Sequence, residues 1–341
     1  MHNAAHQVTL RFADGVEHVV KVGPCETILD AAITQEAPVL FQCRSGSCSS
    51  CTCKLVDGAA SNRPGTTSVL MESEFKAGQR LMCVSQADSD CTIELAYNST
   101  ASAAVGEAHA FIDSVERIAS NVMRLKLELA DEQYLDFKPG QYLQFSVPGA
   151  GVTRSYSPAS TAQALPSLEM LIRLQPGGAM STWLEQGAQP DDVIKMEGPF
   201  GAFYLRDDNR RAPHIFVAGG TGLAPILSMI DGMRQWPGRK PPILLNFGCS
   251  KPQDLFAEED LELRRQWMPT LETRICVSNG ATGDQLPCNP VQALRDTDVT
   301  SPDTVAYLCG PEGMMDAARE RLMALGVAPE NIHSEVFTPS L

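Results

Sequence analysis

The sequence predicts a multidomain protein with an α+β domain first, a β-rich domain in the middle and an α/β domain last. Three observations support this order. A cysteine-rich loop follows two strand patterns and a short helix pattern, residues 108–208 contain alternating polar and apolar stretches, and strand and helix patterns alternate from residue 214 onward. A chain of 341 residues is long enough for two or three domains that each bury a core.

Charge and hydropathy limit the possible partners and location. The formal net charge is −14, whereas nucleic acid and anionic membrane surfaces are bound by basic faces. The N-terminus lacks a signal-peptide pattern, and the most apolar stretch, 215–230, is interrupted by glycines and a proline. We therefore expect a cytoplasmic protein with no nucleic-acid or membrane partner. Because disulfides are rare in the cytoplasm, a chain with eleven cysteines is expected to use some of them as metal ligands or redox groups.

The cysteine-rich loop has the spacing of an iron–sulfur site. Cys43, Cys48 and Cys51 follow the pattern C-x4-C-x2-C, and Cys83 comes after 31 further residues. This is the plant-type [2Fe–2S] spacing. The intervening serines and glycine let the loop wrap a cluster and direct N–H groups at its sulfurs. Zinc is the rival metal, but structural zinc sites favour closely paired ligands, and Cys83 has no close cysteine partner before Cys91.

The remaining cysteines are expected to be structural. The stretch 51–58 alternates as a strand, so Cys51 and Cys53 share one face, with Cys53 moving away from the loop. Isolated cysteines are more often small core residues, and this group comprises Cys25, Cys91, Cys249, Cys276 and Cys288.

The flanking segments complete the first domain. Residues 7–22 are typical of two strands joined by an Asp14-Gly15 turn, 26–37 of a short helix and 91–98 of a closing strand. Residues 1–97 as a whole resemble a plant-type ferredoxin domain, a mixed β-sheet holding one helix. Ser49 departs from the glycine that many such domains have directly after the second cysteine. The small, nearly uncharged stretch 98–107 is expected to be a linker.

The middle segment, 108–208, resembles the flavin-binding domain of the ferredoxin-NADP reductase superfamily. Its marks are alternating strands, a Pro-Gly turn, an R-x-Y-S stretch at 154–157 and the run 177–181. An Arg-Ser-Tyr-Ser stretch alone is ordinary edge-strand composition, so the resemblance depends on the other motifs that occur with it in the same order along the chain. The resemblance implies an antiparallel β-barrel that binds FAD.

The same resemblance implies roles for individual residues. Arg154 would hold a flavin phosphate, Tyr156 would pack on the isoalloxazine ring and Ser157 would lie near flavin N5. Strand alternation puts Arg154 and Tyr156 on one face, with Ser155 and Ser157 on the other. The amides of 177–181 would meet the pyrophosphate at a helix start. The expected FAD-binding set is Arg154, Ser155, Tyr156, Ser157, Gly178, Ala179, Met180 and Ser181.

The last segment, 209–341, predicts a doubly wound parallel sheet. Residues 214–230 have the pattern of a buried strand, a glycine-rich turn and a helix with Pro225 in its first turn. Further strands are expected at 242–250 and 272–280, and a strand with its helix at 305–326.

The motif CGPEGMM at 309–315 and the tail SEVF at 334–337 resemble the same superfamily. This resemblance implies that Cys309 lies beside the nicotinamide and that the tail, with Glu335 and Phe337, covers the flavin site. A buried small residue at a strand end is the alternative for Cys309. The residues expected at the nicotinamide nucleotide are Gly220, Thr221, Gly222, Cys309, Gly310 and Pro311, and those expected to act in catalysis are Ser157, Cys309 and Glu335.

The three modules imply one electron path. A nicotinamide gives two electrons together, an iron–sulfur cluster accepts one at a time, and flavin connects the two. The domain order resembles the reductase component of bacterial aromatic-ring-hydroxylating dioxygenases of the benzoate, anthranilate and naphthalene types. This resemblance implies transfer from NADH through FAD and [2Fe–2S] to a terminal oxygenase, with a Rieske non-haem iron oxygenase favoured.

Two alternatives and one cofactor preference complete these expectations. The order also resembles reductases of soluble diiron monooxygenases for methane, phenol or toluene. A non-enzymatic redox carrier or sensor is the contrasting class, and the intact flavin and nicotinamide motifs argue against it. NADH is favoured over NADPH because the stretch 249–256 has no arginine for a 2′-phosphate. Asp254 there opposes a phosphate, whereas Lys251 would attract one.

Overall fold

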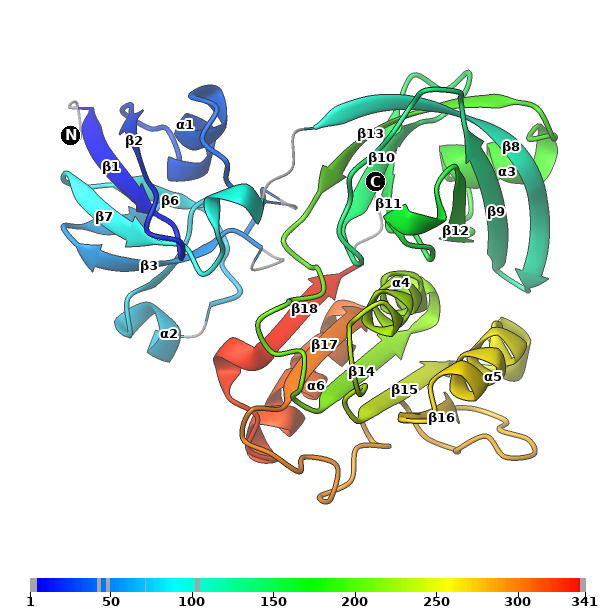
Figure 1. The fold of residues 1–341 in the computed structure, drawn as a ribbon. Coiled ribbons are helices and arrows are strands. Elements are labelled where there is room, and N and C mark those ends of the chain that lie inside the picture. The colour runs from blue at the N-terminus through cyan, green and yellow to red at the C-terminus, as the bar shows by residue number, and fades with distance from the viewer. Residues whose placement is uncertain (1–4, 42–43, 47–49, 71, 102–104, 338–341) are drawn as a thin grey trace. The chain divides into compact units, whose positions relative to one another are not determined.

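The computed structural model describes residues 5–41, 44–46, 50–70, 72–101 and 105–337 (Figure 1). The chain divides into two compact units, of which the second begins at Val105. Within the described ranges, no helix is long and apolar enough to cross a membrane.

The first unit is a mixed β-sheet with the strand order β2-β1-β7-β3-β5. Strand β1 (His6–Arg11) pairs antiparallel with β2 (Glu17–Val22) and parallel with β7 (Cys91–Glu94). Strand β3 (Thr52–Asp57) is antiparallel to both β7 and β5 (Gln79–Leu81). This arrangement confirms the predicted α+β fold class of the first domain.

Smaller elements cover this sheet. Helix α1 (Ile28–Thr34) begins where the hydroxyl of Thr27 accepts a hydrogen bond from the Asp30 amide at 3.1 Å, which is a usual N-cap. One face of the helix is buried through Ile28, Leu29, Ala31 and Ala32. The remaining elements are β4 (Ala60–Asn62), which pairs with β6 (Ser85–Ala87), helix α2 (Glu72–Lys76) and the short helix η1 (Ser99–Ala101).

The second unit begins with a six-stranded sheet in the order β11-β10-β13-β8-β9-β12. An antiparallel bridge between Pro158 and Met170 joins the end of β11 to β12, so the sheet closes into the predicted barrel. Leu125, Leu143 and Phe145 are fully buried inside it. The elements are β8 (Gly106–Ala119), β9 (Val122–Leu129), β10 (Tyr142–Ser146), β11 (Thr153–Tyr156), η2 (Ala162–Ala164), β12 (Ser167–Arg173), α3 (Ala179–Gln186) and β13 (Val193–Phe200).

Strand β8 begins inside the stretch 98–107 that the sequence suggested as a linker. Gly106 and Glu107 pair with Gly198 and Glu197 of β13. That pairing depends on a strand about ninety residues away, by subtraction of the paired residue numbers. The composition of 98–107 alone therefore does not indicate this strand pairing.

The second unit ends with a five-stranded parallel sheet in the order β16-β15-β14-β17-β18. The order corresponds to 3-2-1-4-5, which is typical of a doubly wound sheet, so the predicted doubly wound parallel sheet is confirmed. Helices α4 (Leu223–Arg234) and α5 (Glu258–Trp267) pack on one face and α6 (Glu312–Ala324) on the other. The other elements are β14 (His214–Gly219), η3 (Gly220–Gly222), β15 (Ile243–Cys249), η4 (Pro252–Asp254), β16 (Leu271–Val277), β17 (Val305–Gly310), η5 (Pro329–Asn331) and β18 (Ile332–Val336).

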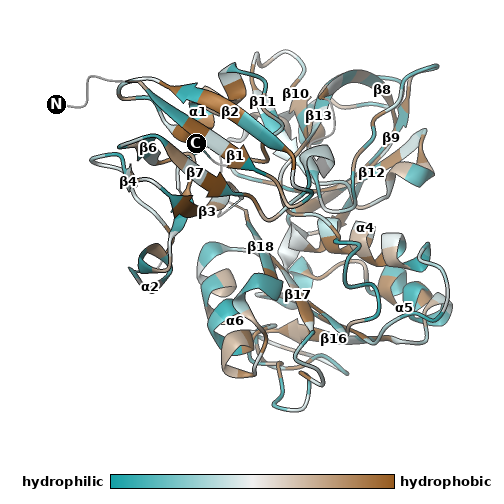
Figure 2. Ribbon diagram, turned by 60° about the vertical axis from the view of Figure 1, so that its left-hand side comes forward, coloured by the Kyte–Doolittle hydropathy of each residue, from teal (hydrophilic) through white to brown (hydrophobic). Residues whose placement is uncertain are grey.

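The burial of these elements explains their sequence patterns. Every residue of β15 is buried, because both faces of a parallel sheet are covered by helices. Helix α6 alternates teal and brown in Figure 2, since only one of its faces, with Met315, Ala318 and Leu322, is buried. The C-terminal stretch predicted only as a tail is the fifth strand, β18, of this sheet.

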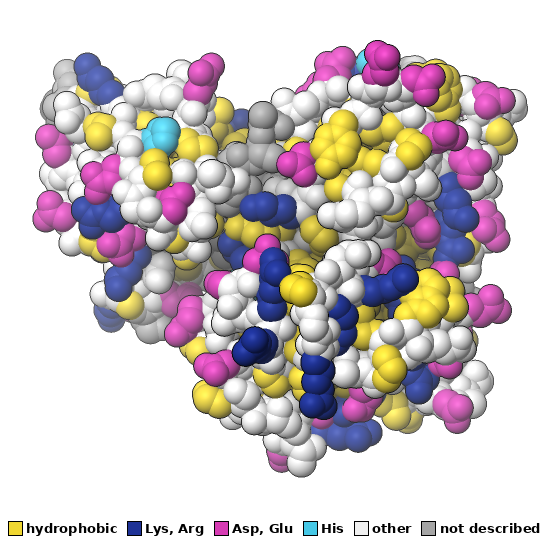
Figure 3. Space-filling view, in the orientation of Figure 1, with side chains coloured by type: hydrophobic (Ala, Val, Ile, Leu, Met, Phe, Trp, Pro, Cys, Tyr) yellow, Lys and Arg dark blue, Asp and Glu magenta, His cyan; other side chains and the backbone are white. Residues whose placement is uncertain are grey.

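Charge is unevenly distributed over the surface. In the view of Figure 3, Lys and Arg side chains gather over the parallel-sheet half of the second unit, whereas Asp and Glu are spread along the outer edge of the barrel. The net charge of −14 therefore describes the whole chain and not each face of it.

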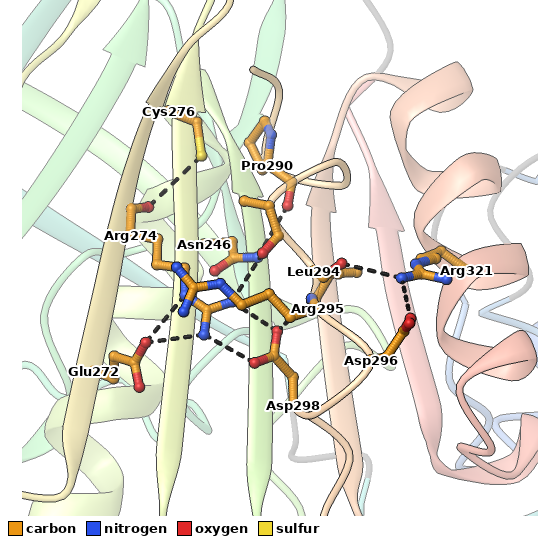
Figure 4. A network of polar contacts seen from close by, with 11 residues as sticks. Asn246, Glu272, Arg274, Cys276, Pro290, Leu294, Arg295, Asp296, Asp298 and Arg321 are labelled. Atoms are coloured by element: carbon orange, nitrogen blue, oxygen red, sulfur yellow. Dashed lines mark hydrogen bonds and ion pairs between the residues drawn. The ribbon is translucent and has the colours of Figure 1, made fainter. Parts of the chain in front are cut away.

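The long connection between β16 and β17 is fastened by a buried ion pair (Figure 4). Arg274 of β16 donates to both carboxylate oxygens of Asp298, at 2.7 and 2.8 Å, and the two side chains are only 7% and 6% exposed. Burial alone would raise the pKa of Asp298, but hydrogen bonds from Arg274 and the Arg295 amide lower it below its ordinary value. The carboxylate is therefore charged and fully engaged, and it holds the connection against the edge strand.

Candidate functional site

The cysteine site is described for two of its expected ligands. Cys51 and Cys83 are 3% and 7% exposed. The backbone N–H of Cys83 donates to Sγ of Cys51 at 3.4 Å, and the N–H of Met82 donates to the Cys51 carbonyl at 3.0 Å. Amide hydrogen bonds to sulfur are characteristic of iron–sulfur ligation. Cys43 and Cys48, together with Ser49, lie outside the described residues.

The loop before Cys51 has a backbone that requires glycine. Gly46 has φ +83°, and a Cβ there would lie 2.2 Å from the Thr67 carbonyl oxygen. The Val69 N–H donates to the Gly46 carbonyl at 3.0 Å. Because the loop is held this closely by its own backbone, it fits the tight wrapping that a cluster needs.

Cys53 lies in β3, two residues after Cys51. It is 2% exposed, and burial together with the neighbouring Cys51 and Cys91 raises its pKa, so it stays a neutral thiol. A buried neutral thiol fits the structural role expected for it.

The expected flavin residues lie at the end of β11. Arg154 and Tyr156 are half-buried and Ser155 is exposed. The Tyr156 ring meets Phe145 edge-on with centroids 5.8 Å apart, and burial, partly opposed by the charge of Arg154, raises the pKa of Tyr156 to about 12. The neutral ring of Tyr156 lies close to the guanidinium of Arg154. This pair would suit a ligand that has both an aromatic ring system and a phosphate.

Ser157 departs from the predicted alternation. It is only 5% exposed, whereas Ser155, placed on the same face by the sequence pattern, is exposed. The strand ends at Tyr156, and Pro158 turns to bridge Met170 and close the barrel. Closure therefore directs Ser157 inward.

Helix α3 begins where the sequence predicted a pyrophosphate-binding turn. Gly178 is its N-cap, and no side chain caps the helix. The hydroxyl of Ser181 accepts a hydrogen bond from the Gln175 amide at 2.8 Å, which braces the turn, while Met180 enters the barrel core. The N–H groups of the first turn of an uncapped helix can bind an anion.

The glycine-rich turn between β14 and α4 is tightly packed. A Cβ at Gly222 would lie 2.2 Å from the Cys309 carbonyl oxygen, and one at Gly219 or Gly310 would lie 2.7 or 2.8 Å from Cε of Met314. Gly220 instead has φ +55° with open space beside it. The glycines bring the carboxyl ends of β14 and β17 together and leave room there for a ligand, with Thr221 also in the turn and only 7% exposed.

The three residues expected to act in catalysis meet at this edge. Cys309 of β17 is the register partner of Glu335 of β18, and the Ser157 hydroxyl donates to Oε2 of Glu335 at 3.3 Å. Cys309 and Glu335 are 0% exposed. Burial and the charge of Glu335 raise the pKa of Cys309 well above its ordinary value, so the thiol is neutral. The Phe337 N–H donates to the Gly310 carbonyl at 3.1 Å, which anchors the tail next to Pro311, the N-cap of α6.

Arg173 is a residue that the sequence analysis did not single out. It ends β12, which packs against η3, the glycine-rich turn. Burial raises the pKa of Cys249 to about 12, and a hydrogen bond from the Gly220 amide and the charge of Arg173 oppose this rise. Arg173 is exposed and forms no ion pair within the described part of the chain. The sequence feature that could have indicated Arg173 is its position as a cation just before the turn 175–178, at the end of a predicted barrel strand.

Comparison with protein families finds three matches along the chain. Residues 11–88 match a "2Fe-2S iron-sulfur cluster binding domain", 109–204 an "Oxidoreductase FAD-binding domain" and 216–320 an "Oxidoreductase NAD-binding domain". These domains and the site geometry define an oxidoreductase that uses a [2Fe–2S] cluster, FAD and a nicotinamide nucleotide.

Relatives extend over nearly the whole chain. The toluate 1,2-dioxygenase electron transfer component of Pseudomonas putida is 32% identical over 98% of this chain and 99% of its own length. The propane 2-monooxygenase reductase component of Rhodococcus jostii is 33% identical over 95% of this chain and 90% of its own length. The protein therefore belongs to the family of iron–sulfur flavoprotein reductases that act as electron-transfer components of oxygenase systems.

Solved structures agree with this family. The crystal structure of an Amycolatopsis cytochrome P450 reductase matches with a TM-score of 0.72 and 27% identity, over 97% of this chain and 99% of that one. The ferredoxin reductase in carbazole 1,9a-dioxygenase, at 23% identity and a TM-score of 0.64, shares the fold over 99% of this chain and 100% of that one.

Proposed function

We propose that this protein transfers electrons from NADH, by way of FAD and the [2Fe–2S] cluster, to a terminal oxygenase that hydroxylates aromatic rings. The observation that carries the proposal is the meeting of Ser157, Cys309 and Glu335, from the barrel and two strands of the nucleotide sheet, in a buried cluster. Such a cluster excludes water from the junction where flavin and nicotinamide would face each other. Several relatives named for aromatic dioxygenases support the oxygenase part.

We assign the cofactor contacts as follows. Arg154 and the first turn of α3 hold the phosphates of FAD, Tyr156 packs on its ring and Phe337 covers it. Cys309 and the glycine-rich turn position the nicotinamide nucleotide. The bound flavin supplies two-electron acceptance and one-electron release, and Ser157 and Glu335 hold a hydrogen bond at the reacting edge. Cys43, Cys48, Cys51 and Cys83 hold the cluster.

We further propose that Arg173 binds the pyrophosphate of the nicotinamide nucleotide. Its guanidinium comes from the barrel, and its charge affects the pKa of Cys249, whose thiol lies at the Gly220 amide of the glycine-rich turn. A guanidinium suits a pyrophosphate because its charge is permanent and its donors are forked. The residue would thus connect both halves of the second unit when the nucleotide is bound.

NADH is the proposed donor. Asp254 follows β15, where nucleotide sheets read the ribose, and its carboxylate accepts a hydrogen bond from the Ser120 hydroxyl at 2.5 Å. A carboxylate held there disfavours a 2′-phosphate. Steady-state assays should give a much higher kcat/KM with NADH than with NADPH. Asp254→Asn should lower the ratio of kcat/KM for NADH to kcat/KM for NADPH. Equal kcat/KM values for the unaltered protein would contradict the preference.

The partner is proposed to be a Rieske non-haem iron oxygenase. Relatives from propane monooxygenase systems keep a diiron monooxygenase as the second candidate. We also propose a cytoplasmic location, since a chain with eleven cysteines suits a reducing compartment.

Two measurements test the proposal. The purified protein should show flavin and iron–sulfur absorption that bleaches when NADH is added, whereas a carrier without reductase activity would not respond. Reconstitution with purified Rieske and diiron oxygenases should then give product formation with the Rieske enzyme. Faster turnover with the diiron enzyme would favour the second candidate.

A further inference from the structure

Arg80 is a cation buried inside the iron–sulfur domain. It lies in β5 and is 9% exposed. Its Nε donates to the carbonyl of Ala60 at 2.9 Å, and its Nη1 donates to those of Phe75 and Gln79 at 2.9 and 2.7 Å. The guanidinium also lies 3.6 Å from the centroid of the Phe75 ring. The side chain is therefore fixed in one place.

The charge of Arg80 has no counter-ion in contact with it. Its three hydrogen-bond acceptors are neutral carbonyl groups, and it makes no ion pair with a carboxylate among the described residues. Asp88 acts on it only at longer range. A guanidinium keeps its proton even when buried. Burying such a charge costs free energy unless something negative stands nearby.

The strand register places Arg80 beside Cys53, two residues from the proposed ligand Cys51. Arg80 is the partner of Cys53 across β3 and β5, and the next pair is Leu81 with Thr52. Partners in an antiparallel pair share a face, so the side chains of Arg80 and Cys53 lie on the same face of the sheet, and Cys51 directly precedes β3. Along the chain, Arg80 and Cys83 are three residues apart, so their Cα atoms are at most about 11 Å apart.

We infer that Arg80 raises the reduction potential of the [2Fe–2S] cluster by supplying this buried positive charge. The inference rests on the proposed ligand set. A cluster held by four thiolates is anionic, and one-electron reduction adds a further negative charge. A fixed cation at this depth favours the reduced state, because buried charges are weakly screened by water and salt. Cluster potentials depend on such local charge. Electron flow from flavin to cluster would be favoured accordingly.

The test is a redox titration of the full-length holoprotein, followed by the electron paramagnetic resonance signal of the reduced cluster. Arg80→Met and Arg80→Gln remove the charge, and Gln can still donate to the carbonyl groups. Both should lower the equilibrium constant for reduction of the cluster about tenfold, which is about 59 mV for one electron. Arg80→Lys keeps the charge and should stay within about threefold, or about 28 mV on the same scale. Lys54→Met removes an exposed cation from β3 and should change the constant less than Arg80→Met does.

The variants separate charge from structure. Unchanged potentials in neutral variants that keep the cluster would overturn the inference, and so would a Lys variant shifted as far as the Gln variant. If Arg80→Met does not retain a cluster, the comparison of Gln with Lys decides. Failure of the proposed function is distinct, because the unaltered holoprotein would then show no [2Fe–2S] signal at all.

Discussion

The hydroxyl of Ser157 donates a hydrogen bond to Oε2 of Glu335 at 3.3 Å, across 178 residues of sequence. Ser157 follows the last residue of a barrel strand, and Glu335 belongs to the last strand of the nucleotide sheet. Both side chains are buried. The bond therefore couples the flavin half to the nicotinamide half at the point where their strands end.

Glu335→Gln and Ser157→Ala should each slow flavin reduction by NADH at least tenfold, since positioned polar groups at a reacting centre usually contribute this much or more. FAD content should remain near that of the unaltered protein, because the proposed phosphate contacts are elsewhere. Stopped-flow absorbance at saturating NADH measures the step. Thr153→Ala, an exposed change on β11, is the control. Additive effects in the double variant would contradict a shared role of the two residues.

Cys309→Ala should slow flavin reduction much more than it weakens flavin binding. The thiol is buried at the end of β17 and its carbonyl packs against Gly222, so the change removes one sulfur atom at the proposed nicotinamide edge. Stopped-flow reduction rates and FAD dissociation constants give the two quantities. A reduction rate equal to that of the unaltered protein would make Cys309 a core residue only.

Cys83→Ser should abolish or cripple the [2Fe–2S] cluster, whereas Cys53→Ser should retain it. Serine at position 53 buries a hydroxyl, so a loss of about 1–3 kcal/mol in stability is expected there. Iron and sulfide analysis with visible absorption reports cluster content. The proposed ligand set fails if the Cys53 variant loses its iron and the Cys83 variant keeps it.

A fragment of residues 106–341 should oxidise NADH with ferricyanide but lose most reduction of cytochrome c and of the oxygenase. It starts where β8 starts, and it keeps both the barrel and the nucleotide sheet. We propose the domain boundary here, close to the end of the stretch 98–107. Small acceptors can take electrons from flavin directly, whereas a protein acceptor should need the cluster. Full oxygenase reduction by the fragment would remove the cluster from the electron path.

Asp298→Asn should destabilise the second unit by about 1–3 kcal/mol, because it removes the buried carboxylate from Arg274 and leaves only Glu272, which lies 2.9 Å from the guanidinium but is 61% exposed. Asp296→Asn is a matched control two residues away. Asp296 pairs with Arg321 at 2.7 Å but is 86% exposed, so the expected cost is below about 1 kcal/mol. Urea unfolding followed by circular dichroism measures both. Equal effects would mean that burial does not govern these pairs.

Stability of the second unit should fall by about 2 kcal/mol between pH 7 and pH 5 through His214 alone. Burial lowers the pKa of His214 from 6.5 to about 4, while its Nδ1 lies 2.8 Å from the Ala212 carbonyl. The unfolded chain therefore takes up a proton first. The stabilisation is complete above about pH 6.5 and is lost as pH falls toward 4.

His214→Phe should flatten that pH dependence, since phenylalanine can still stack on Tyr307 but cannot bind a proton. Removing the hydrogen bond to Ala212 should cost about 1 kcal/mol at pH 7. Unfolding free energies from pH 7 to 5 provide the comparison. An equally steep loss in the variant would assign the effect to other groups, of which His333 is the first candidate because its pKa is also lowered by burial.

The sequence by itself determined the fold classes and the kinds of cofactor. Cysteine spacing, strand alternation around Arg154 and Tyr156, and a glycine-rich turn between strand and helix are local patterns. They are readable because backbone geometry and ligand spacing act over a few residues. The parallel sheet and the barrel followed from these patterns and their resemblance to a known family, and the structure agrees.

Only the tertiary structure decided which distant side chains meet. Barrel closure directs Ser157 inward, where it meets Glu335. The register of β3 and β5 places Arg80 beside Cys53. The connection that follows β16 folds back on this strand, so that Asp298 meets Arg274. A pairing across tens of residues depends on strand order and register, which the local pattern of either segment does not contain. The polar partners of a buried charge therefore appear only when the strands are in place.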